Sequence, residues 1–224
     1  MPFVSALLTF ARMRITIYFF LAFSVLLISS VQGQINVFGA DWVKGKLLLQ
    51  DSEGDTIQCT LRFELDNNLV QIYLANNTVK TYTSRQIKWI QAYDPASKRD
   101  RNFYVFPYAL NNRYVSPTIF EMLTEGTVSL LGREKIVVVQ NTWAGSRFTQ
   151  AQLSFDFYFG FTDGKIRVYR GTRKDFEYLL KDKSGYIRTF IEDSDLRYND
   201  KDDLIRIINQ YNYSNYKDKV SKYE

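Results

Sequence analysis

The chain has 224 residues and a formal net charge of +5, and it contains one cysteine and no histidine. Without histidine, the chain cannot form a Ser-His-Asp or Cys-His catalytic triad or a zinc site with histidine ligands. One cysteine excludes an internal disulfide, and the scattering of lysine and arginine among acidic residues argues against nucleic-acid binding.

A signal peptide is predicted over residues 1–33. Arg12 and Arg14 precede the apolar run Ile15–Ile28, and the run is followed by small residues that suit a signal peptidase. Met13 is a candidate for the natural start. The run is short for a spanning helix, although an uncleaved anchor stays open as an alternative. We therefore expect export to the periplasm, the outer membrane or the medium, with peripheral membrane association as an option.

From Asp41 onward the sequence predicts an antiparallel meander, because turn residues recur about every ten residues between β-rich runs. The predicted strands are Trp42–Leu49, Thr56–Glu64, Leu69–Leu74, Thr78–Thr83, Ile87–Tyr93 and Asn102–Leu110. Pro117–Leu123 is either a short helical turn or a strand. Gly126–Gln140 is either two strands bent at Gly132 or one long hairpin arm.

A β-hairpin is predicted over Leu153–Arg170, where apolar and polar residues alternate on both sides of Asp163-Gly164. An Asp-Gly pair suits the two-residue type I′ turn, which needs positive φ. That turn would place Phe161 opposite Ile166, so that the apolar residues of both strands share one face.

Three amphipathic helices are predicted after the hairpin. Thr172 and Asp175 have the spacing of a capping box, Ser184 can cap a second helix, and Asn199 or Asp200 can begin a third. Each segment has apolar residues at the spacing of one helix face. We expect the helices to cover an open face of the sheet.

The predicted fold class is therefore α+β: a twisted antiparallel sheet of about 8–10 strands, which could be barrel-like, followed by two or three C-terminal helices packed on it. Residues 34–214 are expected to form a single domain. Residues 215–224 are expected to form a frayed, charged tail.

Aromatic residues make up 16% of the chain. Most are expected in the core and in cross-strand pairs, but some could line a groove for a ligand. Asn141–Gln152 is predicted as a polar loop carrying two aromatic residues, and two tyrosines flank the loop Asp94–Arg101. The predicted ligand-binding residues are Trp143, Phe148, Tyr93, Tyr104 and Arg101.

No catalytic residue, metal ligand or cofactor is predicted. Paired carboxylates are the remaining catalytic option, and the available acids lie in turns, as in Asp51–Asp55, on a strand at Asp156, or at helix starts. Acids in turns and helix starts usually serve solubility and capping. Cys59 alternates with Ile57 and Leu61, which predicts a buried and inert thiol.

Three short segments carry a resemblance to a known group. They are Asp41-Trp42-x-x-Gly45, the segment Ile119–Leu123 followed by Gly126, and the ending from Asp202 to Asn212. Together with the signal peptide, they resemble uncharacterised exported proteins of Bacteroidetes-type bacteria. The resemblance implies a location in the cell envelope and no established activity, so it carries no catalytic residue over to this chain.

The sequence favours a non-enzymatic binding module whose partner is an envelope protein or a small ligand such as a glycan, a lipid or a peptide. A carboxylate-dependent hydrolase is the alternative, and two acids about 5–10 Å apart in a deep cleft would favour it. A structural subunit would show a large exposed apolar patch. An outer-membrane-associated barrel is the last alternative, and the C-terminal helices and charged tail argue against it.

Overall fold

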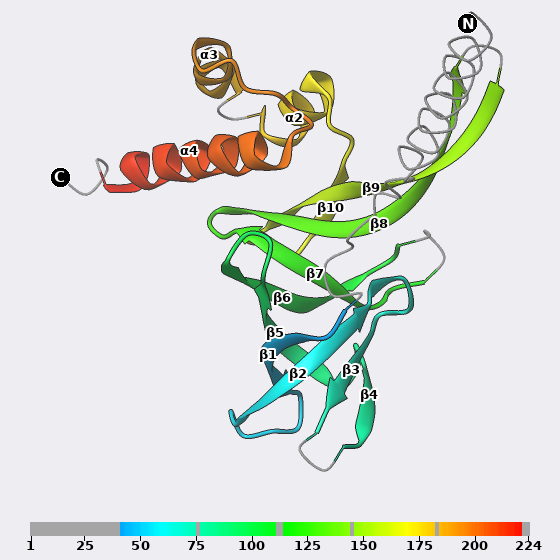
Figure 1. The fold of residues 1–224 in the computed structure, drawn as a ribbon. Helices are drawn as coiled ribbons and strands as arrows, with labels where there is room; N and C mark the ends of the chain where they lie inside the picture. Colours follow the sequence, from blue (N-terminus) through cyan, green and yellow to red (C-terminus); the bar gives the residue numbers. More distant parts are fainter. Residues whose placement is uncertain (1–40, 75–76, 111–113, 144–145, 182–183, 221–224) are drawn as a thin grey trace, which may run out of the picture. The chain divides into compact units, whose positions relative to one another are not determined.

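The computed structural model describes residues 41–74, 77–110, 114–143, 146–181 and 184–220 (Figure 1). The predicted signal peptide lies outside the described residues. The strands are β1 (Val43–Leu49), β2 (Thr56–Glu64), β3 (Leu69–Tyr73), β4 (Val79–Thr83), β5 (Ile87–Asp94), β6 (Arg99–Tyr108), β7 (Ser116–Thr124), β8 (Val128–Trp143), β9 (Ser146–Phe161) and β10 (Ile166–Tyr169). A short 3-10 turn, Leu65–Asn67, joins β2 to β3.

The ten described strands form one antiparallel sheet in the order β10-β9-β8-β7-β6-β5-β1-β2-β3-β4. Neighbours in this sheet are also neighbours in the chain, with one exception. Strand β1 pairs with β5 on one side, while its chain neighbour β2 lies on the other side. Since β4 and β10 each have a single neighbour among the described strands, the sheet is open. The predicted antiparallel α+β architecture is confirmed. The described strands do not close into the barrel that the sequence allowed as an option.

The described helices follow the sheet, as predicted. They are α2 (Arg173–Leu179), α3 (Ser184–Asp193) and α4 (Lys201–Val220). Thr172 caps α2 by accepting a hydrogen bond from the amide of Asp175 at 3.1 Å, and Asp200 caps α4 through the amides of Asp202 and Asp203. Helix α4 continues to Val220, into the segment that the sequence predicted to fray.

The prediction of a loop over Asn141–Gln152 is wrong. β8 and β9 pair without interruption on both sides of residues 144–145, and Asn141 lies opposite Phe148. The ladder itself satisfies the backbone groups of this segment, so its polar residues do not require a loop. Pairing of β8 with β7 ends at Gly132, so beyond that residue β8 and β9 continue as a two-stranded ribbon.

The β9–β10 hairpin forms, but its predicted register is wrong by one residue. Ile166 pairs with Gly160 instead of Phe161, and the amide of Phe161 donates to the carbonyl of Lys165 at 2.9 Å. The loop is therefore three residues long, with positive φ at Gly164 (79°), as in a type I turn with a bulge. The shift puts Tyr169 opposite Phe157, on the face that the helices cover.

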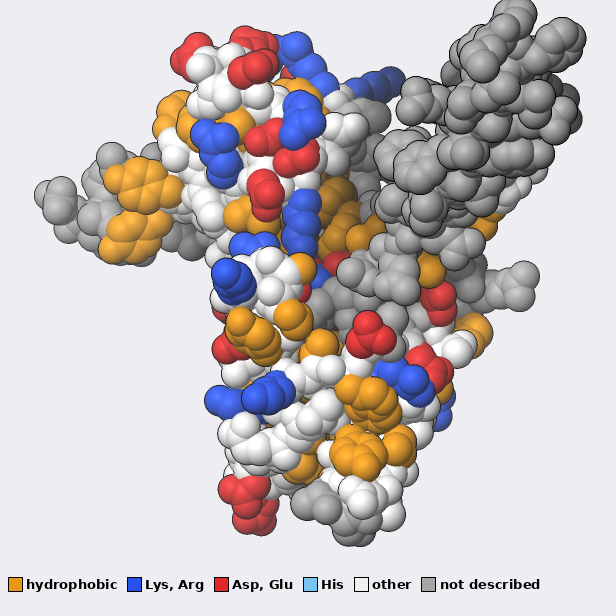
Figure 2. Space-filling view, viewed as in Figure 1, with side chains coloured by type: hydrophobic (Ala, Val, Ile, Leu, Met, Phe, Trp, Pro, Cys, Tyr) orange, Lys and Arg blue, Asp and Glu red, His pale blue; other side chains and the backbone are white. Residues whose placement is uncertain are grey.

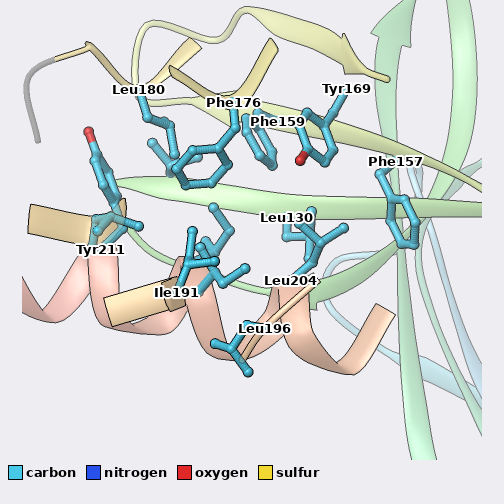
Figure 3. Packing of buried hydrophobic residues seen from close by; sticks show 14 residues of the cluster. Leu130, Phe157, Phe159, Tyr169, Phe176, Leu180, Ile191, Leu196, Leu204 and Tyr211 are labelled. Carbon is cyan, nitrogen blue, oxygen red and sulfur yellow. The ribbon is translucent and has the colours of Figure 1, made fainter. Parts of the chain in front are cut away.

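The helices bury the C-terminal part of the sheet through a core that we call the helix-side cluster (Figure 3). Phe176 of α2 and Leu204 of α4 point toward Leu130 and Phe159 of the sheet, and each of these four side chains is at most 1% exposed. The rings of Phe159 and Tyr169 stack with centroids 4.8 Å apart. Apolar burial on this scale explains why the three short amphipathic segments are helical.

A second core, the N-terminal cluster, lies on one face of β1, β2, β3 and β5 and continues onto β6 and β7. Leu47, Leu61, Ile72 and Ile90 are fully buried in it. Strand residues alternate between the two faces of a sheet, so the residues between these positions project from the opposite face. That opposite face of the N-terminal strands carries the candidate site.

Candidate functional site

An open groove with a volume of about 590 Å³ lies over β1, β2, β3, β5 and the start of β6, and we call it the strand-face groove. Its lining residues are Lys44, Gly45, Lys46, Gln58, Cys59, Thr60, Tyr73, Leu74, Gln91, Tyr93 and Asp100. On the view in Figure 2, basic and hydrophobic side chains adjoin over the N-terminal strands.

One row of polar side chains crosses the groove at Lys46. Lys46 lies opposite Gln58 on one side and opposite Gln91 on the other. Directly opposite residues of antiparallel strands share a face, so the ammonium group stands between two amide side chains. This row offers one charged donor and two groups that can each donate and accept hydrogen bonds.

A second row lies two residues away along β1, at Lys44. Lys44 pairs with Thr60, Thr60 pairs with Tyr73, and on the other side of β1 Tyr93 pairs with Asp100. The register of β1 with β5 brings Tyr93 beside Lys44. The row therefore has a tyrosine toward each end and a lysine and a threonine between them. Tyr73 and Tyr93 are 43% and 41% exposed.

The ring of Tyr73 is held from two sides. Trp42 contacts it edge-on with ring centroids 5.9 Å apart, and the Tyr73 hydroxyl donates to Asn77 Oδ1 at 2.9 Å. Arg62 in turn lies 5.1 Å from the Trp42 ring centroid and donates to Gln71. The tyrosine at this end of the groove is thus fixed before any ligand arrives, which reduces the entropy lost on binding.

Glycine at position 45 lets β1 pack closely against β5 and the N-terminal cluster, on the side away from the opening of the groove. A Cβ atom there would overlap the carbonyl oxygen of Gln91 and the side chain of Leu61. Cys59 belongs to the N-terminal cluster, and burial raises the pKa of its thiol to about 11. The thiol therefore stays protonated near neutral pH. Cys59 is half-buried rather than fully buried as predicted, and its inertness stays a prediction.

The two lysines and two glutamines of the groove have no partner among the described residues. Neither Lys44 nor Lys46 lies within 4.0 Å of an acidic oxygen there, and no described group hydrogen-bonds to the side chains of Gln58 or Gln91. Lys46 and Gln91 are half-buried, while Lys44 and Gln58 are exposed. Unpartnered polar groups gathered around a hollow are available to a ligand.

Arg101, a predicted ligand-binding residue, is not in the groove. It projects from the opposite face of β6 and is 7% exposed. Its guanidinium donates to Glu121 at 2.8 and 2.5 Å and to Glu134 at 2.7 Å, and Lys201 of α4 lies 3.4 Å from Glu121. We call these four residues the buried charge cluster. It joins β6, β7 and β8 to the start of α4.

Electrostatics in the buried charge cluster keep Arg101 charged. Burial alone would lower the pKa of Arg101, but the hydrogen bonds and negative charges of Glu121 and Glu134 raise it. The pKa of Lys201 is lowered by burial, which outweighs the attraction of Glu121. Arg101, Glu121 and Glu134 thus lie together away from water, with the partly exposed Lys201 beside them, and paired charges there are far less costly than any unpaired member.

Glu121 and Glu134 also form a close pair of carboxylates. Because Arg101 Nη2 contacts both, at 2.5 and 2.7 Å, their nearest oxygens lie within about 5 Å, a separation found in glycosidases. However, the two residues are 5% and 7% exposed, and neither lines the strand-face groove or a smaller, 130 Å³ cavity over β6 to β10. The pair is buried and bound to Arg101, and among the described residues neither carboxylate opens into a cleft of the kind that hydrolysis needs.

The remaining predicted residues are placed as follows. Tyr93 lines the strand-face groove. Tyr104 projects from the same face but lies opposite Trp89, four residues along β5 from Tyr93, and it stacks on Phe106 with centroids 6.2 Å apart. Trp143 and Phe148 lie in β8 and β9, and their side chains are outside what the structure describes.

The groove residues that the sequence analysis missed are chiefly Lys44, Lys46, Gln58, Gln91 and Tyr73. Each alternates with an apolar residue, so its outward position is visible in the sequence. Their gathering is not visible, because it depends on β1 inserting between β5 and β2.

Comparison of the chain with protein-family models, with curated proteins and with solved structures gives no match. The resemblance to exported Bacteroidetes-type proteins therefore stays a prediction. None of the helices in the described ranges is long and apolar enough to cross a membrane. Within the same ranges, no three cysteine, aspartate or glutamate side chains gather as a metal site would require.

Proposed function

We propose that this protein is an exported, non-catalytic binding module of the bacterial cell envelope, and that its ligand is a saccharide bound in the strand-face groove. The observation that carries the proposal is the set of unpartnered lysine and amide side chains beside two exposed tyrosines in one groove. The predicted signal peptide and the resemblance to exported proteins support the location.

The chemistry of the groove suits a sugar. A tyrosine ring gives a flat apolar surface for the C–H face of a sugar ring, and amide, hydroxyl and ammonium groups can pair with its hydroxyls. Tyr73 and Tyr93 are three strand spacings apart, which is about 14 Å along the sheet. That span is long enough for more than one sugar ring, so an oligosaccharide could contact both tyrosines.

The structure favours binding over hydrolysis. The close pair of acids Glu121 and Glu134 is buried and bound to Arg101 on the opposite face of the sheet. Among the described residues that line the groove, Asp100 is the single acid, so they do not supply the two carboxylates that most glycoside hydrolases use.

The proposal is tested by measuring binding of the purified chain to a panel of neutral and acidic oligosaccharides by calorimetry. Tyr93→Ala and Tyr73→Ala should each weaken binding by about fivefold to tenfold, the loss expected for one ring contact of about 1 kcal/mol or slightly more. Tyr216→Ala is the matched control, because Tyr216 is a 66% exposed tyrosine on α4. Absence of binding to the whole panel, or equal losses in all three variants, would contradict the proposal.

Export is tested separately. Expressed in a bacterium with a cell envelope of the Bacteroidetes type, the chain should lose residues 1–33. N-terminal sequencing of the mature protein should then begin at Gln34. Recovery of an unprocessed chain in the cytoplasm would contradict this part of the proposal.

A further inference from the structure

We infer that the strand-face groove selects saccharides that carry carboxylate groups, such as oligomers of uronic acids. The inference rests on the proposed function and adds the chemical class of the sugar. It comes from the charges that stand in the groove and from the place of each charge across the strands.

The positive charge of the groove is concentrated on its central strand. Lys44 and Lys46 both project from the groove face of β1, with Cα atoms about 7 Å apart. No acidic group of the described residues lies within ion-pairing distance of either ammonium. A neutral sugar would leave both charges without a counter-charge, whereas a carboxylate in each of two successive rings could pair with both.

The negative charge of the groove lies at one edge. Asp100 is on β6, two strands from Lys44, which is about 10 Å across the sheet. Its partner across the strands is Tyr93, and no ion pair joins it to a described lysine or arginine. A carboxylated ligand is therefore attracted toward β1 and repelled at the β6 edge, where Asp100 can instead accept hydrogen bonds from sugar hydroxyls. This arrangement fixes the position of the acid groups along the groove.

The two glutamines of the groove favour the same position for an acid group of the ligand, over β1. Gln58 and Gln91 flank Lys46 on both sides, so an anion over Lys46 can accept hydrogen bonds from two amide groups as well as from the ammonium. Hydrogen bonds to an ionised acceptor are stronger than those between neutral groups. Arg62 adds positive charge nearby, although Trp42 and Gln71 already hold its guanidinium.

The inference is tested by calorimetry on the purified chain at low salt with three probes of four monomer units each: tetragalacturonate, maltotetraose and tetraglutamate. Tetragalacturonate should bind about tenfold more tightly than maltotetraose, and Lys44→Gln and Lys46→Gln should each weaken it by about fivefold. Lys80→Gln, on the exposed strand β4, removes the same charge outside the groove and should leave binding unchanged. Raising the ionic strength to about 0.3 M should reduce the preference for tetragalacturonate.

The outcomes separate the inference from the proposed function. If maltotetraose binds as tightly as tetragalacturonate and both depend on Tyr93, the acidic preference is overturned while the saccharide groove stands. If tetraglutamate binds as tightly as tetragalacturonate, the groove recognises charge alone and the inference fails. If no oligosaccharide binds, the proposed function itself is overturned. Thermal melts of each variant ensure that only folded protein enters the comparison.

Discussion

Replacing Arg101 with methionine tests the buried charge cluster most directly. Methionine keeps much of the side-chain volume but removes the guanidinium that three hydrogen bonds of 2.5 to 2.8 Å join to Glu121 and Glu134. The two carboxylates would stay buried, with Lys201 as a nearby base at 3.4 Å from Glu121. Breaking a buried ion pair by removing one partner costs about 3–5 kcal/mol.

That loss is large compared with the stability of a domain, which is about 5–15 kcal/mol. For a chain of this size it should lower the melting temperature by about 6–20 °C. Urea unfolding followed by tryptophan fluorescence measures the free energy of unfolding, and a parallel thermal melt gives the temperature shift.

The triple variant Arg101→Met, Glu121→Gln, Glu134→Gln is the informative control. It removes the stranded negative charges along with the arginine, so it should be more stable than Arg101→Met alone. A single variant that loses less than about 1 kcal/mol, or a triple variant less stable than the single one, would refute the reasoning. Saccharide binding should survive in the folded single variant, because Arg101 lies on the face opposite the strand-face groove.

Three further predictions concern other parts of the fold. The pKa of Asp94 is lowered despite its partial burial, because Ser97, the amide of Ala96 and Arg101 favour the carboxylate. Its stabilisation is therefore complete above the ordinary value of 3.8 and is lost as the pH falls through the lowered value, so Asp94→Asn should flatten acid unfolding curves measured below pH 4. Cys59, with its pKa raised to about 11, should react with a thiol reagent at pH 8 about 100-fold more slowly in the native chain than in urea; equal rates would contradict the burial. Asn212 bonds both backbone groups of Val128, at 2.9 and 2.8 Å, so Asn212→Ala should cost about 2 kcal/mol in urea unfolding, whereas the exposed Tyr216→Ala on the same helix should cost almost nothing.

The local elements of this chain follow from residues close together in sequence. Alternation of apolar and polar residues predicts β2 to the residue, and Thr172 and Asp200 mark the starts of α2 and α4 because capping needs an oxygen at that position. Burial of the helices on the sheet follows from their apolar stripes. These features depend on interactions within a few residues, which a sequence pattern records directly.

The wrong predictions concern segments whose residues are compatible with two different local structures. Asp163-Gly164 fits a two-residue turn and also a three-residue turn with a bulge, since both accept glycine at positive φ. The three-residue turn is the one that forms, and with it Tyr169 packs against Phe159 and Phe176 on the helix side. The polar residues of Asn141–Gln152 predict a loop, whereas the pairing of β8 with β9 makes this segment part of two strands.

The sequence by itself determined that this chain builds antiparallel strands followed by capped, amphipathic helices, and it named Tyr93 as a candidate ligand-binding residue. Only the tertiary structure decided that β1 lies between β5 and β2, which brings Lys44 and Tyr93 into one groove and sends Arg101 into a buried cluster on the other face. The physical reason is that alternation fixes which face a side chain occupies, whereas the order of strands depends on pairing between segments far apart in the chain.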